Sequence, residues 1–223
     1  MPYIKANGQP SSCLVTFSIG GIHGLEFNQK RKRYGYISVD PCQHEDFSGY
    51  YPMLISRMGS FWPHDQKTDT YRHLYIERLH LKHQLRKYTK NSPKWDKINL
   101  QQKLRKLLLN AASGAGAGGF TNNLRMNNAM VSMRIIGQLF AWRIGEAETL
   151  AGGRVPSTNT DGMYVMDLSS QFNNEVLFKN VKAMMLDIIP SPLDRFVSKD
   201  ANNRVEVEDS NNKPVLTDAK GAP

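Results

Sequence analysis

Apolar side chains recur at helical spacing in several parts of the chain. The stripe through Tyr71, Leu81 and Tyr88 predicts an amphipathic helix over residues 71–88, and a loop around Pro93 separates it from a second helix over about 97–112. Because the connecting loop is short, we expect these two helices to form an antiparallel hairpin. The same spacing predicts two further buried helices, over about 122–149 and about 171–187.

Between the helices lie short segments rich in β-branched and aromatic residues. One of them is a strand that ends in Asp46, before the chain is expected to turn at Pro52. Other strands are expected at 14–19, 34–39, 195–198 and 204–208. The Gly- and Ala-rich segment 115–119 is expected to be flexible.

The clearest β-hairpin signal is the turn sequence Asn159-Thr160-Asp161-Gly162, which joins strands at 154–158 and 163–168. With the other elements it predicts an α+β fold. In this fold, helices cover one antiparallel sheet, and the helical hairpin protrudes from it.

The composition excludes few classes of protein. The chain has 223 residues, of which 40% are hydrophobic and 22% charged, as in an ordinary globular protein. Its longest apolar stretch is interrupted by Arg134, Gln138 and Arg143, so no membrane-spanning helix is expected. Cys13 and Cys42 have no zinc-site spacing, and the N-terminus lacks the apolar segment of a signal peptide. These features favour a cytoplasmic protein.

The net charge of +9 is concentrated in one segment. Residues 67–106 contain 12 Lys and Arg side chains and only 3 acids, so this segment carries the net charge of the whole chain. A neutral body with one basic arm suits a polyanionic partner that is bound at one place. Arg78, Lys82 and Arg86 lie four apart on one ridge of the first helix, where they either contact phosphates or only solvate the arm.

Two acidic side chains stand where a metal ion is readily held. Asp46 ends a strand and Asp161 lies at the tip of the β-hairpin, although each is otherwise a common turn or capping acid. Mg²⁺ binds carboxylate oxygens, and a pair of such ions assists nucleotidyl transfer. Strand alternation points His44 and Asp46 to one face and Glu45 to the other, which argues against a metal cluster of these three.

Three motifs, in this order, resemble those of family B DNA polymerases. Asp46-Phe47-Ser48-Gly49-Tyr50-Tyr51-Pro52 resembles the first palm motif, an Asp followed by Ser-Leu-Tyr-Pro. Lys106-Leu107-Leu108-Leu109-Asn110-Ala111-Ala112-Ser113-Gly114 resembles the second, Lys-x3-Asn-Ser-x-Tyr-Gly. Thr158-Asn159-Thr160-Asp161-Gly162 resembles the third, in which Asp-Thr-Asp occupies a hairpin turn. The basic helical hairpin falls where the family has its fingers.

Two shorter matches flank these motifs, so that the resemblance covers residues 17–208. Ser18-Ile19-Gly20-Gly21 resembles the Tyr-x-Gly-Gly/Ala element of protein-primed phage polymerases. Lys199-Asp200-Ala201-Asn202-Asn203-Arg204 lies where the family has a Lys-x-Tyr element that holds the primer.

The chain departs from the family pattern at several positions: Ser18, Ala111, Ser113 and Asn159. Asn159 replaces the first Asp of the third motif. In the family the second Asp of that motif is the main metal ligand, and it is kept here as Asp161. Asn159 is therefore interpreted as a tolerated variant.

The resemblance implies template-directed DNA synthesis, in which deoxynucleoside triphosphates are added to a primer 3′-hydroxyl. It implies that two Mg²⁺ ions are held by Asp46, Asp161 and Phe47. It implies that the nucleotide is bound by Tyr51, Arg78, Lys103, Lys106 and Asn110. Contacts with primer-template DNA are implied for Gly20, Gly21, Lys82, Lys199 and Asn202.

The resemblance also implies a division into domains. Residues 1–64 and 115–210 would form the palm, 65–114 the fingers, and 211–223 a loose tail or the start of a thumb. An exonuclease domain or a full thumb would then have to come from a separate chain or be absent. The likeness to viral enzymes implies the cytoplasm of an infected bacterial host, with no membrane partner.

Two other hypotheses remain open. An inactivated palm and fingers would still hold DNA as a binding module, and Asn159 and the missing thumb favour this hypothesis. An unrelated metal-dependent phosphotransferase would match the motifs by coincidence. It would have no reason to place Lys106 and Asn110 on one face of a helix in a basic arm.

Overall fold

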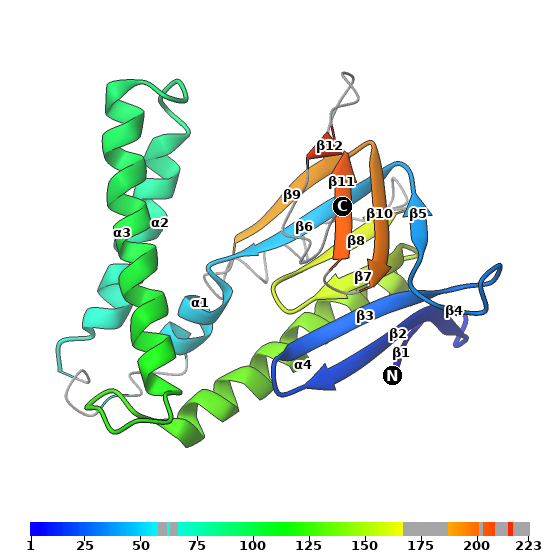
Figure 1. Ribbon diagram of the computed structural model, residues 1–223, viewed down its shortest axis with the longest axis horizontal. Helices are drawn as coiled ribbons and strands as arrows, with labels where there is room; N and C mark the ends of the chain where they lie inside the picture. Colours follow the sequence, from blue (N-terminus) through cyan, green and yellow to red (C-terminus); the bar gives the residue numbers. More distant parts are fainter. Residues whose placement is uncertain (58–61, 63–66, 167–186, 201–202, 208–213, 216–223) are drawn as a thin grey trace. The chain divides into compact units, whose positions relative to one another are not determined.

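The structure is a computed structural model that describes residues 1–223 except 58–61, 63–66, 167–186, 201–202, 208–213 and 216–223 (Figure 1). The described part of the chain contains strands and helices in the following order: β1 (Pro2–Ile4), β2 (Pro10–Ser18), β3 (Gly21–Asn28), β4 (Arg33–Tyr34), β5 (Ile37–Val39), β6 (Cys42–Ser48), α1 (Tyr50–Arg57), α2 (Thr70–Leu85), α3 (Pro93–Gly116), α4 (Asn127–Leu150), β7 (Arg154–Asn159), β8 (Gly162–Met166), β9 (Asp187–Leu193), β10 (Arg195–Asp200), β11 (Asn203–Val207) and β12 (Pro214–Val215).

The chain forms two compact units. Unit 1 comprises Met1–Ser48 and Gly137–Pro223, and unit 2 comprises Gly49–Ile136. Unit 1 therefore contains the sheets and most of α4, whereas unit 2 contains α1, α2, α3 and the start of α4. The domain boundaries expected from the sequence, after residues 64, 114 and 210, stay a prediction.

Unit 1 is built on a large antiparallel sheet with the strand order β1-β2-β3-β7-β8-β6-β9, to which β4 is added beside β3. A smaller antiparallel sheet has the order β12-β11-β10-β5. Figure 1 shows α4 running along the large sheet. This architecture confirms the α+β fold with an antiparallel sheet flanked by helices.

Helix α4 packs closely on one face of the large sheet. Gly145 permits this approach, because a Cβ atom there would lie 2.5 Å from the ring of Tyr3. Nearer the N-terminal end of α4, the Gln138 side chain donates to the Ser18 carbonyl oxygen over 2.8 Å. The sheet therefore has a buried face under α4, and the strands in the middle of its order lie deepest.

The smaller sheet covers the opposite face. The ring of Tyr164 in β8 stacks on that of Phe196 in β10, with 3.8 Å between the ring centroids. Around this pair lies an apolar cluster that includes Ile37, Val39, Cys42 and Leu193. Because β6 and β8 have packed layers on both sides, their positions are fixed more firmly than those of the edge strands.

In unit 2, α2 and α3 form the antiparallel hairpin expected from the sequence. The Tyr71 hydroxyl lies 3.3 Å from the Leu109 carbonyl oxygen, and Arg105 pairs with Glu77 over 2.7 Å. The second helix begins earlier than expected, at Pro93, because the Ser92 side chain caps it by accepting from the backbone N–H of Trp95. It also continues through Gly116, so the expectation of a flexible segment from 115 is wrong for its first two residues.

The expected turn at Pro52 is also wrong. β6 continues past Asp46 to Ser48, the chain bends at Gly49 with a φ of 68°, and α1 begins at Tyr50. Pro52 lies in the first turn of α1, where the missing backbone N–H has no partner to lose.

The expected strand over 34–39 is two strands in different sheets. Gly35 (φ 84°) and Tyr36 (φ 56°) adopt the left-handed conformation and separate β4 from β5. Neither β3 nor β9 was expected, and the helix predicted over 171–187 lies outside the described residues except Asp187, which opens β9.

The described helices include none that is long and apolar enough to cross a membrane.

Two carboxyl groups are buried together between the large sheet and α4. Glu45 in β6 and Glu148 in α4 are both fully buried, and three of their four side-chain oxygens have no hydrogen-bond partner. Burial raises the pKa of Glu45 to about 7. Burial, together with the charge of Glu45, raises the pKa of Glu148 to about 8. Both groups therefore stay protonated to a higher pH in the folded protein than an exposed Glu does.

We predict that Glu148→Gln flattens the pH dependence of stability. A folded-state pKa above the ordinary 4.5 means that the folded protein loses stability as the pH rises from 4.5 through about 8. Above that range the variant should be more stable than the wild type by about 1 kcal/mol or more, which raises Tm by ~2–4 °C. Thermal unfolding across this pH range measures the effect. Glu146→Gln, in the same helix, is the control, and an equal effect there would contradict the assignment.

Candidate functional site

Asp46 and Asp161 lie on neighbouring strands of the large sheet. Asp46 in β6 is paired with Gly162, the first residue of β8, and Asp161 precedes that residue in the turn 159–162. The backbone N–H of Phe47 donates to the Asp161 carbonyl oxygen over 2.7 Å. Asp46 is half-buried and Asp161 is exposed. The structure thus brings the two predicted acids and Phe47 together at one edge of unit 1.

Gly162 makes this close pairing possible. A Cβ atom at this position would lie 2.7 Å from the carbonyl oxygen of Glu45 and 3.3 Å from the His44 ring. Any side chain here would push the turn away from β6. The glycine at the end of the turn motif is therefore required by the strand next to it.

The face of β6 that carries Asp46 also carries His44. The His44 ring stacks on Tyr164 with 4.6 Å between centroids, and its Nδ1 lies 3.7 Å from a carboxylate oxygen of Glu206. Burial lowers the pKa of His44 below its ordinary value, and Glu206 opposes this shift. The charges of Asp46 and Asp161 oppose the lowering of the His44 pKa as well. Glu45 is on the opposite face, as strand alternation predicts.

Glu206 joins the two sheets beneath this site. Its carboxylate accepts a hydrogen bond from the Tyr164 hydroxyl and another, of 3.3 Å, from Arg204. The Arg204 guanidinium also lies 5.6 Å from the centroid of the Tyr164 ring. This buried network was not expected from the sequence, because its members come from β6, β8 and β11, and their spacing carries no local pattern.

The Gly20-Gly21 turn packs directly against the turn that carries Asp161. Gly21 has a φ of 147°, and a Cβ atom on it would lie 1.9 Å from the hydroxyl of Thr160. The Ser18 hydroxyl donates to the Gly21 carbonyl oxygen over 2.9 Å and closes this β2–β3 turn. The predicted Gly20-Gly21 element is therefore part of the same site, although its contact with DNA stays a prediction.

Asn159 is held by a histidine from the neighbouring strand. Its side-chain oxygen lies 3.0 Å from Nδ1 of His23 in β3. With that oxygen accepting from the ring N–H, one of its two lone pairs is engaged, and the other polar group of Asn159 is an amide NH₂ that only donates hydrogen bonds. The arrangement leaves Asp46 and Asp161 as the carboxylates at this edge. In the described part of the chain, no group of three or more His, Cys, Asp and Glu side chains forms a metal site.

The candidates on α3 lie in unit 2. Lys103, Lys106 and Asn110 are exposed along one side of the helix. Ser113, which follows at the same spacing, is turned toward α2, with its hydroxyl 3.0 Å from that of Tyr71. Tyr51 in α1 is half-buried, and its ring lies 5.9 Å from that of Tyr50.

The expected exposed ridge of Arg78, Lys82 and Arg86 needs a correction. Arg78 is buried, and it packs next to Gly49, where an added Cβ would lie 3.1 Å from its guanidinium. Lys82 is half-buried and Arg86 is exposed. Gly49 has no side chain and leaves room for the Arg78 guanidinium inside unit 2. Arg78 is therefore not part of an exposed basic surface.

The last predicted DNA contacts lie in or beside the β10–β11 ribbon. Lys199 is exposed in β10, and its carbonyl oxygen accepts from the backbone N–H of Tyr36 over 3.2 Å. Asn202 lies outside the described residues.

The sequence of this chain matches no protein-family model and no curated protein. Its structure is similar to that of the family B DNA polymerase from the hyperthermophilic archaeon Pyrobaculum calidifontis, with a TM-score of 0.59. The two share 15% sequence identity over 79% of this chain and 27% of that chain. The fold is polymerase-like. At this identity the likeness concerns the fold alone, and the chain spans about a quarter of the length of that polymerase.

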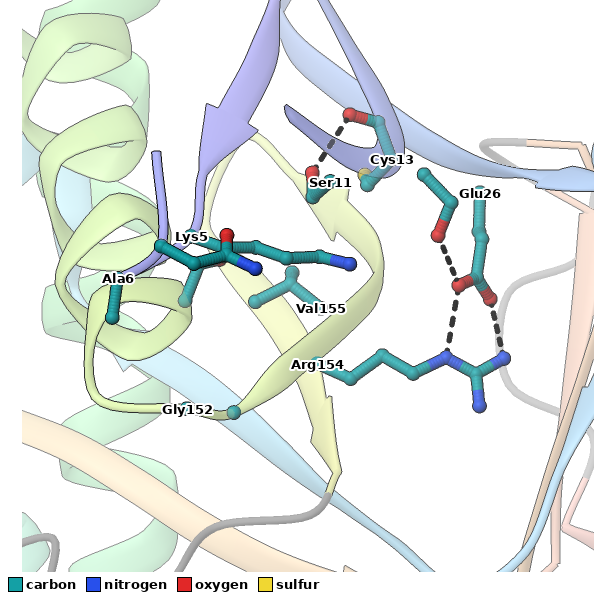
Figure 2. Close-up of a pocket in the computed structure, with 12 residues that line it drawn as sticks. Lys5, Ala6, Ser11, Cys13, Glu26, Gly152, Arg154 and Val155 are labelled. Atoms are coloured by element: carbon teal, nitrogen blue, oxygen red, sulfur yellow. Dashed lines mark hydrogen bonds and ion pairs between the residues drawn. The ribbon is translucent and has the colours of Figure 1, made fainter. Parts of the chain in front are cut away.

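A cavity of about 550 Å³ lies elsewhere in the polymerase-like fold, at the opposite end of β7 from the turn 159–162 (Figure 2). Arg154 pairs there with the buried carboxylate of Glu26, to which Ser12 also donates over 2.5 Å. Lys5 and Cys13 line the same cavity. The carboxylate of Glu26 is thus bound by Arg154 and Ser12 within the cavity.

We predict that His23 and Asn159 are energetically coupled. Their hydrogen bond should contribute about 1 kcal/mol to the free energy of unfolding, and a double-mutant cycle with His23→Ala and Asn159→Ala should return a coupling energy of this size. Urea unfolding of the four proteins measures it. A cycle of His23→Ala with Ser132→Ala, an exposed position in unit 2, is the control. Additive effects in the His23–Asn159 cycle would show that the hydrogen bond does not form.

Proposed function

We propose that this chain is the palm and fingers of a DNA polymerase, and that it adds deoxynucleoside triphosphates to a primer 3′-hydroxyl as directed by a template. The observation that carries this proposal is the pairing of Asp46 with Gly162, which holds Asp161 beside β6. The polymerase-like fold supports it, because in that fold Asp46 and the turn that carries Asp161 belong to paired strands.

The residues at this edge suit divalent cations that prefer oxygen ligands. Asp46 and Asp161 supply carboxylates on adjoining backbone segments, and the resemblance adds the backbone carbonyl of Phe47. When bound there, Mg²⁺ would neutralise phosphate charge and favour the attack of the primer oxygen on the α-phosphorus. The contribution of the chain is to hold the two carboxylates in place. β6 does this from between two packed layers, and the Gly162 contact fixes the turn against it.

The fingers role belongs to the α2–α3 hairpin. Lys103, Lys106 and Asn110 present two cations and one amide from a single side of α3. Lys106 would neutralise the triphosphate as charge moves toward the leaving pyrophosphate, and Asn110 would position it by hydrogen bonding. Tyr51 would lie under the sugar and exclude a 2′-hydroxyl. These assignments follow from the motif resemblance, together with exposed positions on α3.

Finer features of the proposal come from the resemblance alone. They are a phage-type, protein-primed relative, the palm and fingers boundaries, two Mg²⁺ ions, and a separate chain that supplies a thumb or an exonuclease. Primer-template DNA would contact Gly20, Gly21, Lys82, Lys199 and Asn202.

A second function is favoured by one observation, the engagement of the Asn159 oxygen by His23. If two carboxylates are too few to hold the metal ions, the chain is a DNA-binding module that has the polymerase-like fold but no nucleotidyl-transfer activity. The two functions make opposite predictions for substitutions in the turn 159–162.

Primer extension in Mg²⁺ by the wild type, Asp161→Asn and Asn159→Asp separates the two functions, with any thumb-bearing chain that they require. For a polymerase, Asp161→Asn should abolish extension, a loss of at least about 10²-fold, while DNA affinity stays near that of the wild type. Asn159→Asp should leave activity intact or change it modestly. A silent wild type that Asn159→Asp partly revives would favour the binding module, and activity that survives in Asp161→Asn would overturn the site.

A second prediction concerns the nucleotide. Lys106→Ala should lower kcat/KM for the incoming nucleotide by about tenfold or more, because one charge on the triphosphate is no longer neutralised. Lys97→Ala removes an equally exposed charge from the far side of α3 and should have little effect. Steady-state kinetics at varied nucleotide concentration measure both, and equal losses would assign the effect to the general charge of the arm.

A further inference from the structure

Four consecutive cations form an exposed turn in unit 1. Lys30, Arg31, Lys32 and Arg33 connect β3 to β4, and all four side chains are exposed. None of them takes part in an ion pair with an acid in the described part of the chain. They lie far along the sequence from the basic arm of unit 2, at the end of β3 opposite Gly21 (Figure 1).

Two of the four cations rest on an aromatic ring. The Arg31 guanidinium lies 4.5 Å and the Arg33 guanidinium 4.3 Å from the centroid of the Tyr36 ring. Such cation–π contacts hold the flat guanidinium groups in place while their N–H edges remain available for other partners. A pair of arginines ordered in this way loses less rotamer entropy on binding than free side chains do.

The backbone of the turn is tied down at several points. The Asn28 side chain accepts from the backbone N–H of Arg31 over 3.0 Å and donates to the carbonyl oxygen of Tyr36. The backbone N–H of Gly35 donates to the Glu26 carbonyl oxygen over 3.1 Å. Lys32 (φ 53°) and Tyr36 (φ 56°) adopt the left-handed conformation, which side-chain-bearing residues adopt at a cost. The backbone of the turn is therefore held in one conformation by these hydrogen bonds.

A fifth cation joins the turn from the smaller sheet. The backbone N–H of Tyr36 donates to the carbonyl oxygen of Lys199, and a Cβ on Gly35 would lie 2.2 Å from that oxygen. Only glycine permits this approach, which sets the backbone of Lys199 against the end of the turn. Asp200, the next residue, is the acid nearest to this group in sequence.

We propose that this basic turn, Lys30–Arg33 with Lys199, binds the phosphate backbone of duplex nucleic acid. Arginine side chains bind phosphate oxygens through two parallel N–H groups, and a duplex presents phosphates at the density that several adjacent cations can use. The ring of Tyr36 is covered by the two guanidinium groups, whereas Tyr34 packs edge-on against Phe27 and stays exposed at 43%. The cations of the turn, and not the Tyr36 ring, therefore meet the ligand, and a duplex presents its phosphates outward while its bases stay stacked inside.

This binding is separate from the chemistry at Asp46 and Asp161. It needs no metal ion and no nucleotide, and it gives unit 1 its own hold on nucleic acid. Apart from Lys199, which the resemblance also places on primer-template DNA, the turn uses no residue of the proposed polymerase site, so the two proposals can fail independently.

The test measures the affinity of the full chain for a short fluorescent DNA duplex by anisotropy, without divalent cations, over a series of salt concentrations. Arg31→Ala/Arg33→Ala should weaken binding at low salt. It should also make the slope of log K against log [salt] shallower by about 1.8, for two lost phosphate contacts. Arg143→Ala/Arg195→Ala is the matched control, because it removes the same charge from exposed arginines that already pair with Glu146 and Asp40.

An unchanged slope in Arg31→Ala/Arg33→Ala, or an equal change in the control pair, would overturn the proposal. A larger loss for the single strand than for the duplex would overturn the duplex assignment. Loss of binding only to phosphatidylserine vesicles or to a polyglutamate peptide would assign the turn to a membrane or an acidic protein instead. If thermal unfolding shows that the alanine pair destabilises the turn, Arg31→Gln/Arg33→Gln, whose longer side chains can still pack on Tyr36, takes its place.

Discussion

The register between β6 and β8 is the constraint on which the candidate site depends. Asp46 is paired with Gly162. Because this glycine has no Cβ atom, the turn lies close to the Glu45 carbonyl oxygen. At this distance the Asp161 carbonyl oxygen accepts a hydrogen bond from the backbone N–H of Phe47. A shift of one residue would move Asp46 to the α4 face and bring Glu45 to the site. That face already holds Glu148, whose buried carboxyl tolerates Glu45 as a protonated neighbour. The layers on each side of β6 thus select one register.

Much of this arrangement could be predicted where chemistry is local. The turn residues 159–162 indicated a β-hairpin, and the apolar stripe from Tyr71 indicated the first helix of the arm. Asp46 and the turn that carries Asp161 lie on paired strands. β3 was missed because Gly20-Gly21-Ile22-His23-Gly24 has the composition of a turn, and the strand is stabilised by its neighbours instead of by its own residues. β9 was missed because Pro190 and Pro192 argue against a strand, yet it pairs with β6 at the edge of the sheet.

Contacts between distant residues account for the rest. The hydrogen bond between His23 and Asn159 spans most of the chain, and nothing near either residue indicates it. The charge pattern misled in another way. Because the residues outside 67–106 sum to zero, the body of the chain was interpreted as electrically featureless, yet acids elsewhere offset the four cations at 30–33. A net charge conceals any cluster that is balanced at a distance, so local runs need to be examined separately.

The stack of His44, Tyr164 and Phe196 has a mechanical consequence. These three rings run from the large sheet into the smaller one, and Glu206 binds the hydroxyl of the middle ring. If one sheet slid over the other, the three rings would lose their stacking and the hydrogen bond to Glu206 would break at the same time. The two sheets are therefore expected to resist sliding. A load applied to the β10–β11 ribbon, at Lys199 for example, would reach β6 as a rigid displacement two residues from Asp46. Asp46 is thus carried by a strand that is packed on both faces.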